Sequence, residues 1–217
     1  MKIQNTITRK GDRSLNKHVR EFLMFPDVLI MLTLFLIVTG FTISHLNELT
    51  TWIAIAVGAI VYALSEYGIH RFVFHMKTPE NPFLLKMIKR LHFDHHENQT
   101  DLHLLFLPLW FSIPSFAITV LLAYWITSNL VLTIAFATGL VGYFLFYEWK
   151  HFVAHKPLQP LTKLGKEIKK AHLWHHFKNE NYWYGVTHTT IDKTFGTFKN
   201  QALVEKSETA RNLEKRV

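Results

Sequence analysis

Long uncharged apolar stretches alternate with basic segments along this 217-residue chain. Residues 28–47 and 49–65 hold no charged side chain, and residues 102–147 hold none either. A helix needs about 20 apolar residues to cross the hydrocarbon core of a membrane, so the third stretch is long enough for two crossings. A soluble all-α protein is disfavoured, because charge-free runs of this length are rare in soluble helices. The pattern predicts an all-α membrane protein with spans at residues 28–46, 50–68, 106–126 and 131–149 and a turn at 127–129.

Lysine and arginine fall before the first predicted span, between the second and third, and after the fourth. The two remaining connections, near Glu48 and Asn129, contain none. By the positive-inside rule, both termini are expected on the cytoplasmic side of a bacterial inner membrane or, in a eukaryote, of the endoplasmic reticulum. The residues that set this orientation include Arg9, Lys10, Arg13, Lys17 and Arg20 in one segment and Arg71, Lys77, Lys86, Lys89 and Arg90 in another.

The net charge of +8 therefore belongs to the predicted cytoplasmic side. Anionic lipid headgroups and an acidic electron-donor protein are its expected partners, and nucleic acid is the weaker explanation. The first apolar run starts too late and is too long for a cleavable signal peptide, so it is expected to remain as an anchor.

Histidine is the residue type that carries the candidate chemistry, with 14 copies in a chain that has no cysteine. The absence of cysteine excludes disulfides, Fe–S clusters and thiolate zinc sites. Four clusters follow the inner ends of the second and fourth predicted spans. They are HRFVFH with His70 and His75, HFDHH with His92, His95 and His96, HFVAH with His151 and His155, and HLWHH with His172, His175 and His176.

The spacing within each cluster suits helices. Residues at i, i+3 and i+4 share a helical face, so each HxxHH motif is expected to aim three imidazoles at one point. His151 and His155 are spaced i, i+4 and would do the same. His70 and His75 are spaced i, i+5, which places them about 140° apart on an ideal helix. They require a distorted helix end, or they serve two different metals.

An internal repeat joins the clusters into two similar halves. The segment LLKMIKRLHFDHH begins at Leu84 and LGKEIKKAHLWHH at Leu164, and each follows its histidine pair at the same distance. One metal takes four to six ligands, so about ten imidazoles imply two metals. Unrelated interfacial histidines are disfavoured, because without a metal the packed rings would leave many nitrogens unpaired.

Imidazole suits zinc, copper, iron and nickel alike. We favour two iron ions because neutral ligands in an apolar setting suit oxygen activation, and zinc can take their place in purified protein. O2 is then the expected co-substrate.

Other candidates surround the clusters. Glu66 and Glu148 stand four and three residues before His70 and His151, and each is expected to accept a ring N–H. His188 is a candidate substrate-side residue. The weaker candidates are Asp94 and Glu97 beside the first HxxHH and the aromatic residues Trp174, Tyr182, Trp183 and Tyr184 at an entrance, while His18, His45 and His103 are interpreted as bystanders.

These motifs, with the closing YGVTHTTIDKTFGT, resemble the fatty acid hydroxylase (sterol desaturase) superfamily over residues 60–200. They are most similar to fatty acyl 2-hydroxylases that act on sphingolipid acyl chains. The resemblance implies four spans, a cytosolic helical cap over a dimetal site, and O2-dependent C–H oxidation with external electrons. It also implies that the ten clustered histidines are the metal ligands. The predicted organisation is a cytosolic segment at 1–27, an integral membrane hydroxylase domain at 28–200 and a polar tail at 201–217.

Two departures from that family pattern are visible. No His-Pro-Gly-Gly heme motif of a cytochrome b5 domain is present, so a separate cytochrome b5-like or ferredoxin-like donor is expected. His188 stands where such hydroxylases have a small residue. The predicted function is diiron hydroxylation of a lipid acyl chain, with the 2-position favoured. Oxidation of a sterol, hopanoid or carotenoid in the same superfamily is the alternative, and a metal transporter is remote because transporters bind ligands near mid-membrane.

Overall fold

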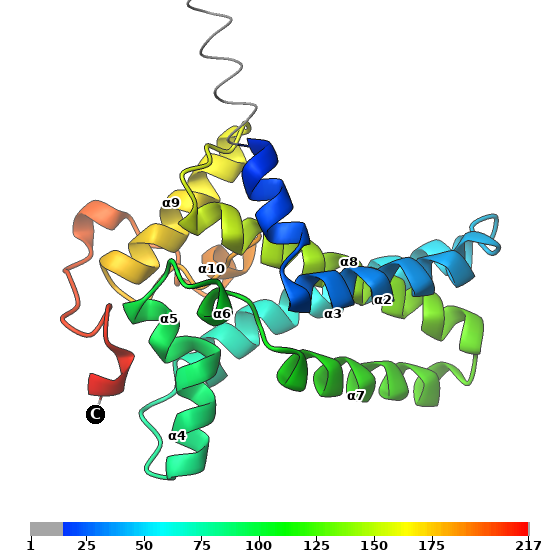
Figure 1. Ribbon diagram of the computed structural model, residues 1–217, viewed down its shortest axis with the longest axis horizontal. Helices are drawn as coiled ribbons and strands as arrows, with labels where there is room; N and C mark the ends of the chain where they lie inside the picture. Colours follow the sequence, from blue (N-terminus) through cyan, green and yellow to red (C-terminus); the bar gives the residue numbers. More distant parts are fainter. Residues whose placement is uncertain (1–14, 217) are drawn as a thin grey trace, which may run out of the picture.

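Four long helices form a bundle in the computed structural model, which describes residues 15–216 (Figure 1). Their lengths and composition are sufficient to cross a membrane. The four helices are α2 (Pro26–Ile43), α3 (Leu49–Gly68), α7 (Leu109–Thr127) and α8 (Leu130–His155). The four predicted spans are confirmed, with the last helix continuing six residues past the predicted end at 149. His151 and His155 therefore lie on the spanning helix itself.

Local sequence explains where these helices begin and end. Pro26 occupies the first turn of α2, where its missing N–H costs nothing. The turn predicted at 127–129 is confirmed: Ser128 adopts a left-handed conformation with φ 47°, and the side chain of Asn129 accepts a hydrogen bond from the Leu132 N–H at the start of α8. Only Ser128 and Asn129 lie between α7 and α8, so the two helices are antiparallel neighbours.

Helix α8 is the centre of the bundle and packs against α2, α3 and α7. Glycines permit the closest of these contacts. A Cβ atom on Gly139 would lie 1.9 Å from the Ile55 carbonyl oxygen, and one on Gly58 would lie 2.0 Å from that of Phe136. The backbones of α3 and α8 therefore touch directly, which fixes the distance between the two helices that end in histidine pairs.

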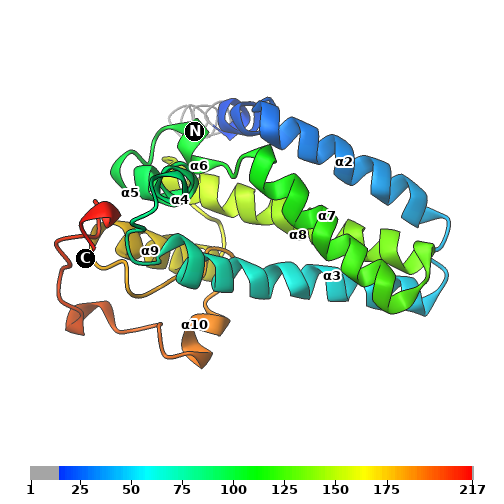
Figure 2. The same cartoon turned by 90° about the horizontal axis from the view of Figure 1, so that it is seen from below.

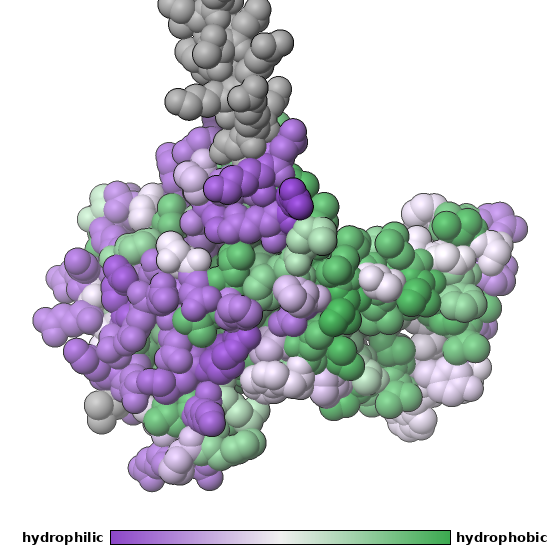
Figure 3. Space-filling view, in the orientation of Figure 1, coloured by the Kyte–Doolittle hydropathy of each residue, from purple (hydrophilic) through white to green (hydrophobic). Residues whose placement is uncertain are grey.

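The surface of the bundle is apolar where that of a soluble protein would be polar. Leu36 and Ile118 are 60% exposed, and Trp125 is 79% exposed. Figure 3 shows hydrophobic residues covering the long helices and mostly hydrophilic residues covering the end of the molecule that holds the short helices. With four such helices, the chain is a multi-pass membrane protein. The orientation of that membrane stays a prediction, and Arg9, Lys10 and Arg13 lie outside the described residues.

Short helices and loops form a cap over one end of the bundle (Figures 1 and 2). The Asn81 side chain caps α4, and Thr162 caps α9, by accepting hydrogen bonds from the first turn of each helix. The cap comprises η1 (Ile69–Phe74), α4 (Pro82–Ile88), η2 (Lys89–Phe93), α5 (Asp94–Glu97), α6 (Leu102–Leu105), α9 (Lys163–Phe177), α10 (Thr190–Thr194), η3 (Gln201–Leu203) and η4 (Leu213–Lys215). The cap carries three of the four histidine motifs, and the fourth, with His151 and His155, ends α8.

Substituting Gly139→Ala is expected to lower stability by about 2 kcal/mol or more, because the new methyl group would overlap the backbone of α3. Thermal unfolding of the detergent-solubilised protein measures this loss. Gly40→Ala is the matched control, since nothing lies within 4 Å of a Cβ at that position in α2. Equal melting temperatures for the two variants would contradict the close α3–α8 contact.

Candidate metal centre

A π-helical turn solves the problem posed by the i, i+5 spacing of His70 and His75. The N–H of His75 donates to the carbonyl oxygen of His70 at 3.1 Å, and η1 is π-helical from Ile69 to Phe74. The wider turn returns residue i+5 to the face of residue i. The expectation of a distorted helix end is confirmed, and the alternative of two different metals for this pair is wrong.

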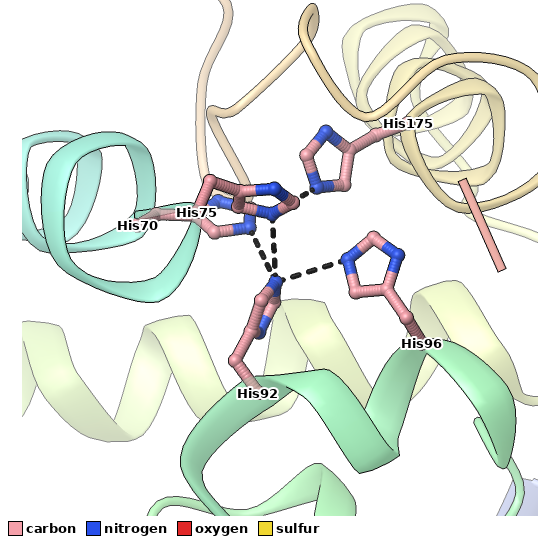
Figure 4. Close-up of side chains that lie close together, drawn as sticks. All are labelled: His70, His75, His92, His96 and His175. Atoms are coloured by element: carbon pink, nitrogen blue, oxygen red, sulfur yellow. Dashed lines mark hydrogen bonds between the residues drawn. The ribbon is translucent and has the colours of Figure 1, made fainter. Parts of the chain in front are cut away.

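Ten histidines converge in two groups of five. Within each group, one ring nitrogen of every member lies within 4.8 Å of the others. The first histidine group contains His70, His75, His92, His96 and His175, and the second contains His95, His151, His155, His172 and His176. Figure 4 shows the rings of the first group pointing toward one another, although they come from segments far apart in the sequence: η1 and its C-terminal end, η2, α5 and α9. The structure thus brings together every histidine that the sequence selected as a ligand.

The two HxxHH motifs exchange their middle histidines. His92 and His96 belong to the first group, whereas His95 belongs to the second. In the other motif, His172 and His176 belong to the second group, whereas His175 belongs to the first. The expectation that each motif aims three rings at one point is wrong. On an α-helix residues i and i+4 are about 40° apart, whereas residue i+3 lies about 60° and 100° from them. The ring at position i+3 therefore points toward the other histidine group. Each group takes its fifth ring from the other half of the chain.

The separations of the ring nitrogens fit metal coordination. The Nε2 atom of His92 lies 3.2 Å from that of His70, 2.8 Å from that of His75 and 3.0 Å from that of His96. Two nitrogens bound at right angles about 2.1 Å from one cation are about 3 Å apart. A single proton on His92 could satisfy only one of these three contacts. In the second group, both ring nitrogens of His176 are buried without a hydrogen-bond partner among residues 15–216.

Backbone carbonyl groups fix the tautomers of three rings in the first histidine group. A carbonyl oxygen only accepts, so Nδ1 of His70 donates to Tyr184 at 2.5 Å, that of His175 to Tyr182 at 2.7 Å and that of His96 to Ala210 at 2.7 Å. In each neutral ring the Nε2 atom then carries the lone pair. This is the arrangement in which a histidine binds a metal.

Burial keeps these rings neutral. It lowers the pKa of His96 to about 3 and, together with neighbouring imidazoles, lowers the pKa of His92, His95 and His176 well below the ordinary value. The cause is the cost of placing a charged imidazolium in an apolar surrounding. At neutral pH the nitrogens are therefore available as neutral ligands.

The predicted polar tail packs over the first histidine group. Arg216 donates to the carbonyl oxygen of His75 at 2.9 Å, and Arg211 donates to that of Glu97 at 2.9 Å. Leu213 is completely buried beside Ile88. Sequence reasoning missed this contact, and the signal for it was the presence of Ala210 and Leu213 among the polar residues 205–216.

Glu66 and Glu148 do not accept hydrogen bonds from histidines, which corrects the prediction made for both. Glu66 accepts from the N–H groups of Val186 and Thr187 at 2.7 and 2.9 Å, and from the Thr187 hydroxyl. Glu148 accepts from the Leu107 N–H at 3.0 Å. These N–H groups belong to irregular segments in apolar surroundings, where an unpaired donor is costly, so they compete successfully for the carboxylates.

Asp192 is a third buried carboxylate, which sequence reasoning missed. It accepts from the N–H groups of Tyr184 and Gly185 at 2.9 and 2.7 Å and from the Thr197 hydroxyl at 2.7 Å. The closing motif YGVTHTTIDKTFGT thus folds on itself and delivers the Tyr184 carbonyl group to His70. Asp94 instead faces Lys89 at the surface, with Nζ–O 3.6 Å.

His188 belongs to neither histidine group and is half-buried, and burial lowers its pKa. Trp183 is completely buried and its indole N–H donates to the Lys199 carbonyl oxygen, so it cannot line an entrance as expected. His18 and His45 pair with Glu21 and Glu48 away from both groups.

A small, mainly apolar cavity of about 80 Å³ lies beneath the histidines, between α3, α7 and α8. The Phe74 ring in its wall stacks on His92, with ring centroids 5.2 Å apart. Tyr147, also in the wall, packs against His151, with ring centroids 5.7 Å apart. One aromatic ring therefore lies between the cavity and each histidine group: Phe74 for the first group and Tyr147 for the second.

Comparison with known proteins agrees with this geometry. A fatty acid hydroxylase family model matches residues 55–197. The chain is 32% identical over 167 residues to the ceramide very long chain fatty acid hydroxylase of Saccharomyces cerevisiae, covering 73% of this chain and 41% of that protein. It is 34% identical over 148 residues to a dihydroceramide fatty acyl 2-hydroxylase of Arabidopsis thaliana, covering 66% and 59%. The matches thus span less than two thirds of either relative.

A solved structure, described as full-length scs7p with only the hydroxylase domain visible, superimposes with a TM-score of 0.74. It is 28% identical in sequence, and the match covers 82% of this chain and 67% of that one.

Paired histidine substitutions test the exchange between the motifs. If each group holds one metal ion, His95→Ala with His172→Ala damages only the second group, so one ion is expected to remain per chain. His95→Ala with His92→Ala changes one motif but damages both groups, so both ions are expected to be lost. Elemental analysis of the purified proteins measures this. Loss of a single ion in the second pair would show that each motif serves one site.

Proposed function

The chain belongs to the fatty acid hydroxylase family, and from that membership we propose that it hydroxylates the acyl chain of a membrane lipid at the carbon next to the carboxyl group. The observation that carries the proposal is the position of an apolar cavity directly beneath two five-histidine groups. The names of the relatives, which include fatty acyl 2-hydroxylases, support the class of substrate and the position of the oxygen.

Two iron ions are the proposed cofactors, one in each histidine group. Five neutral nitrogens suit a six-coordinate ion and leave one position for a non-protein ligand. Bound iron would supply the activation of O2. Zinc fits the same nitrogens but has no redox chemistry, so zinc-loaded protein should be inactive.

The proposed reaction breaks one C–H bond and forms one C–OH bond. One oxygen atom of O2 enters the product and the other leaves as water, which requires two electrons and two protons from outside. A separate electron-donor protein of the cytochrome b5 or ferredoxin class is proposed as their source. The cap exposes basic side chains such as Lys170 and Lys199, which would attract an acidic donor.

The protein's own part in this reaction is to bind, to position and to exclude water. The cavity walls are predominantly apolar, and Phe74 and Tyr147 place their rings against the histidines. An acyl chain in this cavity would hold one C–H bond close to both groups without water. Glu66 and Glu148 are committed to backbone N–H groups, so we assign them to positioning of the adjacent loops.

The cavity also bears on the alternatives. A sterol or hopanoid is a wide, rigid ring system, whereas the cavity between α3, α7 and α8 has a volume of only about 80 Å³, which favours a narrow chain. A transporter would place its ligands near mid-membrane, but both histidine groups lie at the cap end of the spanning helices.

Expression in a bacterium supplied with iron and air is expected to yield lipids whose acyl chains are heavier by one oxygen atom. Mass spectrometry of the total lipids, with fragmentation to locate the hydroxyl group, makes the measurement. His172→Ala removes a ligand of the second group, so the product should fall by at least about a hundredfold, within the range of losses seen when a metal site is damaged. His45→Ala, at the opposite end of the bundle, should leave the yield unchanged. An oxidised ring lipid in place of a hydroxyacyl chain would overturn the proposal.

A further inference from the structure

A second cavity continues the first one away from the histidines. It has a volume of about 450 Å³, lies between the same three helices, and shares one wall residue, Thr119, with the first cavity. On α3 the walls of the two cavities extend from Glu66 to Thr50. At a rise of 1.5 Å per residue this is about 24 Å, most of the hydrocarbon thickness of a membrane. The two cavities follow each other along the bundle and meet at Thr119, and together they are called the groove here.

The walls of the groove are mainly apolar, although Glu66 and Ser112 line its inner part, and two of its hydroxyl groups are satisfied within α7. The hydroxyl of Ser115 donates to the Phe111 carbonyl oxygen at 2.7 Å, and that of Thr119 donates to the Ser115 carbonyl oxygen at 2.8 Å. These side chains therefore satisfy their polar atoms within α7 and keep little free hydrogen-bonding capacity toward the groove. The outer part adds Ala123 of α7 and Phe136 of α8 to its walls.

The shape and chemistry of the groove commit it to one occupant, a single extended acyl chain. Its walls follow the spanning helices, are predominantly apolar, and begin beneath the histidines, and its two cavities meet at Thr119. We propose that Thr119 sets the length of acyl chain that this protein accepts, since it lines the junction through which a longer chain must pass. This inference rests on the proposed function, because the carboxyl end of the chain is taken to lie near the histidines.

A bulky side chain at the junction would divide the groove. Chains whose tails end in the inner cavity would still bind, whereas longer chains would lose the outer cavity. Ala123 lies one helical turn farther from the histidines, a distance of about 6 Å. The same substitution there should therefore exclude only chains that are longer still. If the longest chain that binds is shorter in the Thr119 variant than in the Ala123 variant, the groove measures chain length. A general loss of binding would affect chains of all lengths equally.

The full-length protein in detergent, loaded with metal, is titrated with saturated fatty acids of increasing length, and the retained chain is measured by native mass spectrometry. Thr119→Phe is expected to weaken binding of the longest chains by about tenfold or more, within the range for one excess group in an apolar pocket. Ala123→Phe should move the limit by a smaller amount. Thr119→Leu provides a milder version should the phenylalanine variant fail to fold.

Ala117→Phe is the matched control, because Ala117 lies on an exposed face of α7 outside both cavities. It should bind the same chains as the wild type. A wild-type length limit that both Thr119 variants leave unchanged overturns the inference, as does a wild-type protein that retains no acyl chain. A shifted limit in a protein that forms no hydroxylated lipid would support the role of Thr119 and count against the proposed reaction.

Discussion

Ten neutral imidazoles packed in two groups of five, with ring nitrogens within 4.8 Å of one another in each group, cannot satisfy their own nitrogens, and this constraint explains most of the structure around them. Where Nδ1 donates to a carbonyl group, as in His70, His96 and His175, the Nε2 lone pair points into the group and repels its neighbours. A cation at the centre turns that repulsion into coordination. The π-turn at Ile69–Phe74 and the folded tail each deliver a ring or a carbonyl group to that arrangement.

The exchange of His95 and His175 makes the two halves of the chain interdependent. Each half contributes a spanning helix, a histidine pair and an HxxHH motif, yet each histidine group takes its fifth nitrogen from the other half. The angular positions of i, i+3 and i+4 on a helix impose this result once two such motifs face each other. Two similar modules thus produce two sites that neither module could complete.

The sequence was sufficient for the spans, the ten histidines and the need for a distorted helix at His70, because these depend on local composition and spacing. It was insufficient for the partners of Glu66 and Glu148. Their partners are N–H groups from residues 186–187 and 107, far away along the chain, and nothing in the local spacing reveals them. The packing of Ala210 and Leu213 over the histidines was missed for the same reason. A single buried leucine in a polar segment leaves no periodic pattern.

The contact between Gly58 and Gly139 links the metal centre to the groove. It fixes the separation of α3 and α8. At the cap end, α3 leads directly into η1 with His70, and α8 carries His151. The same two helices, with α7, enclose both cavities. A change in their separation would therefore alter the width available to a chain and the distance between the two histidine groups together. For this reason the glycine contact, although remote from the histidines, is a structural condition for any chemistry that requires a chain to end beneath two metals.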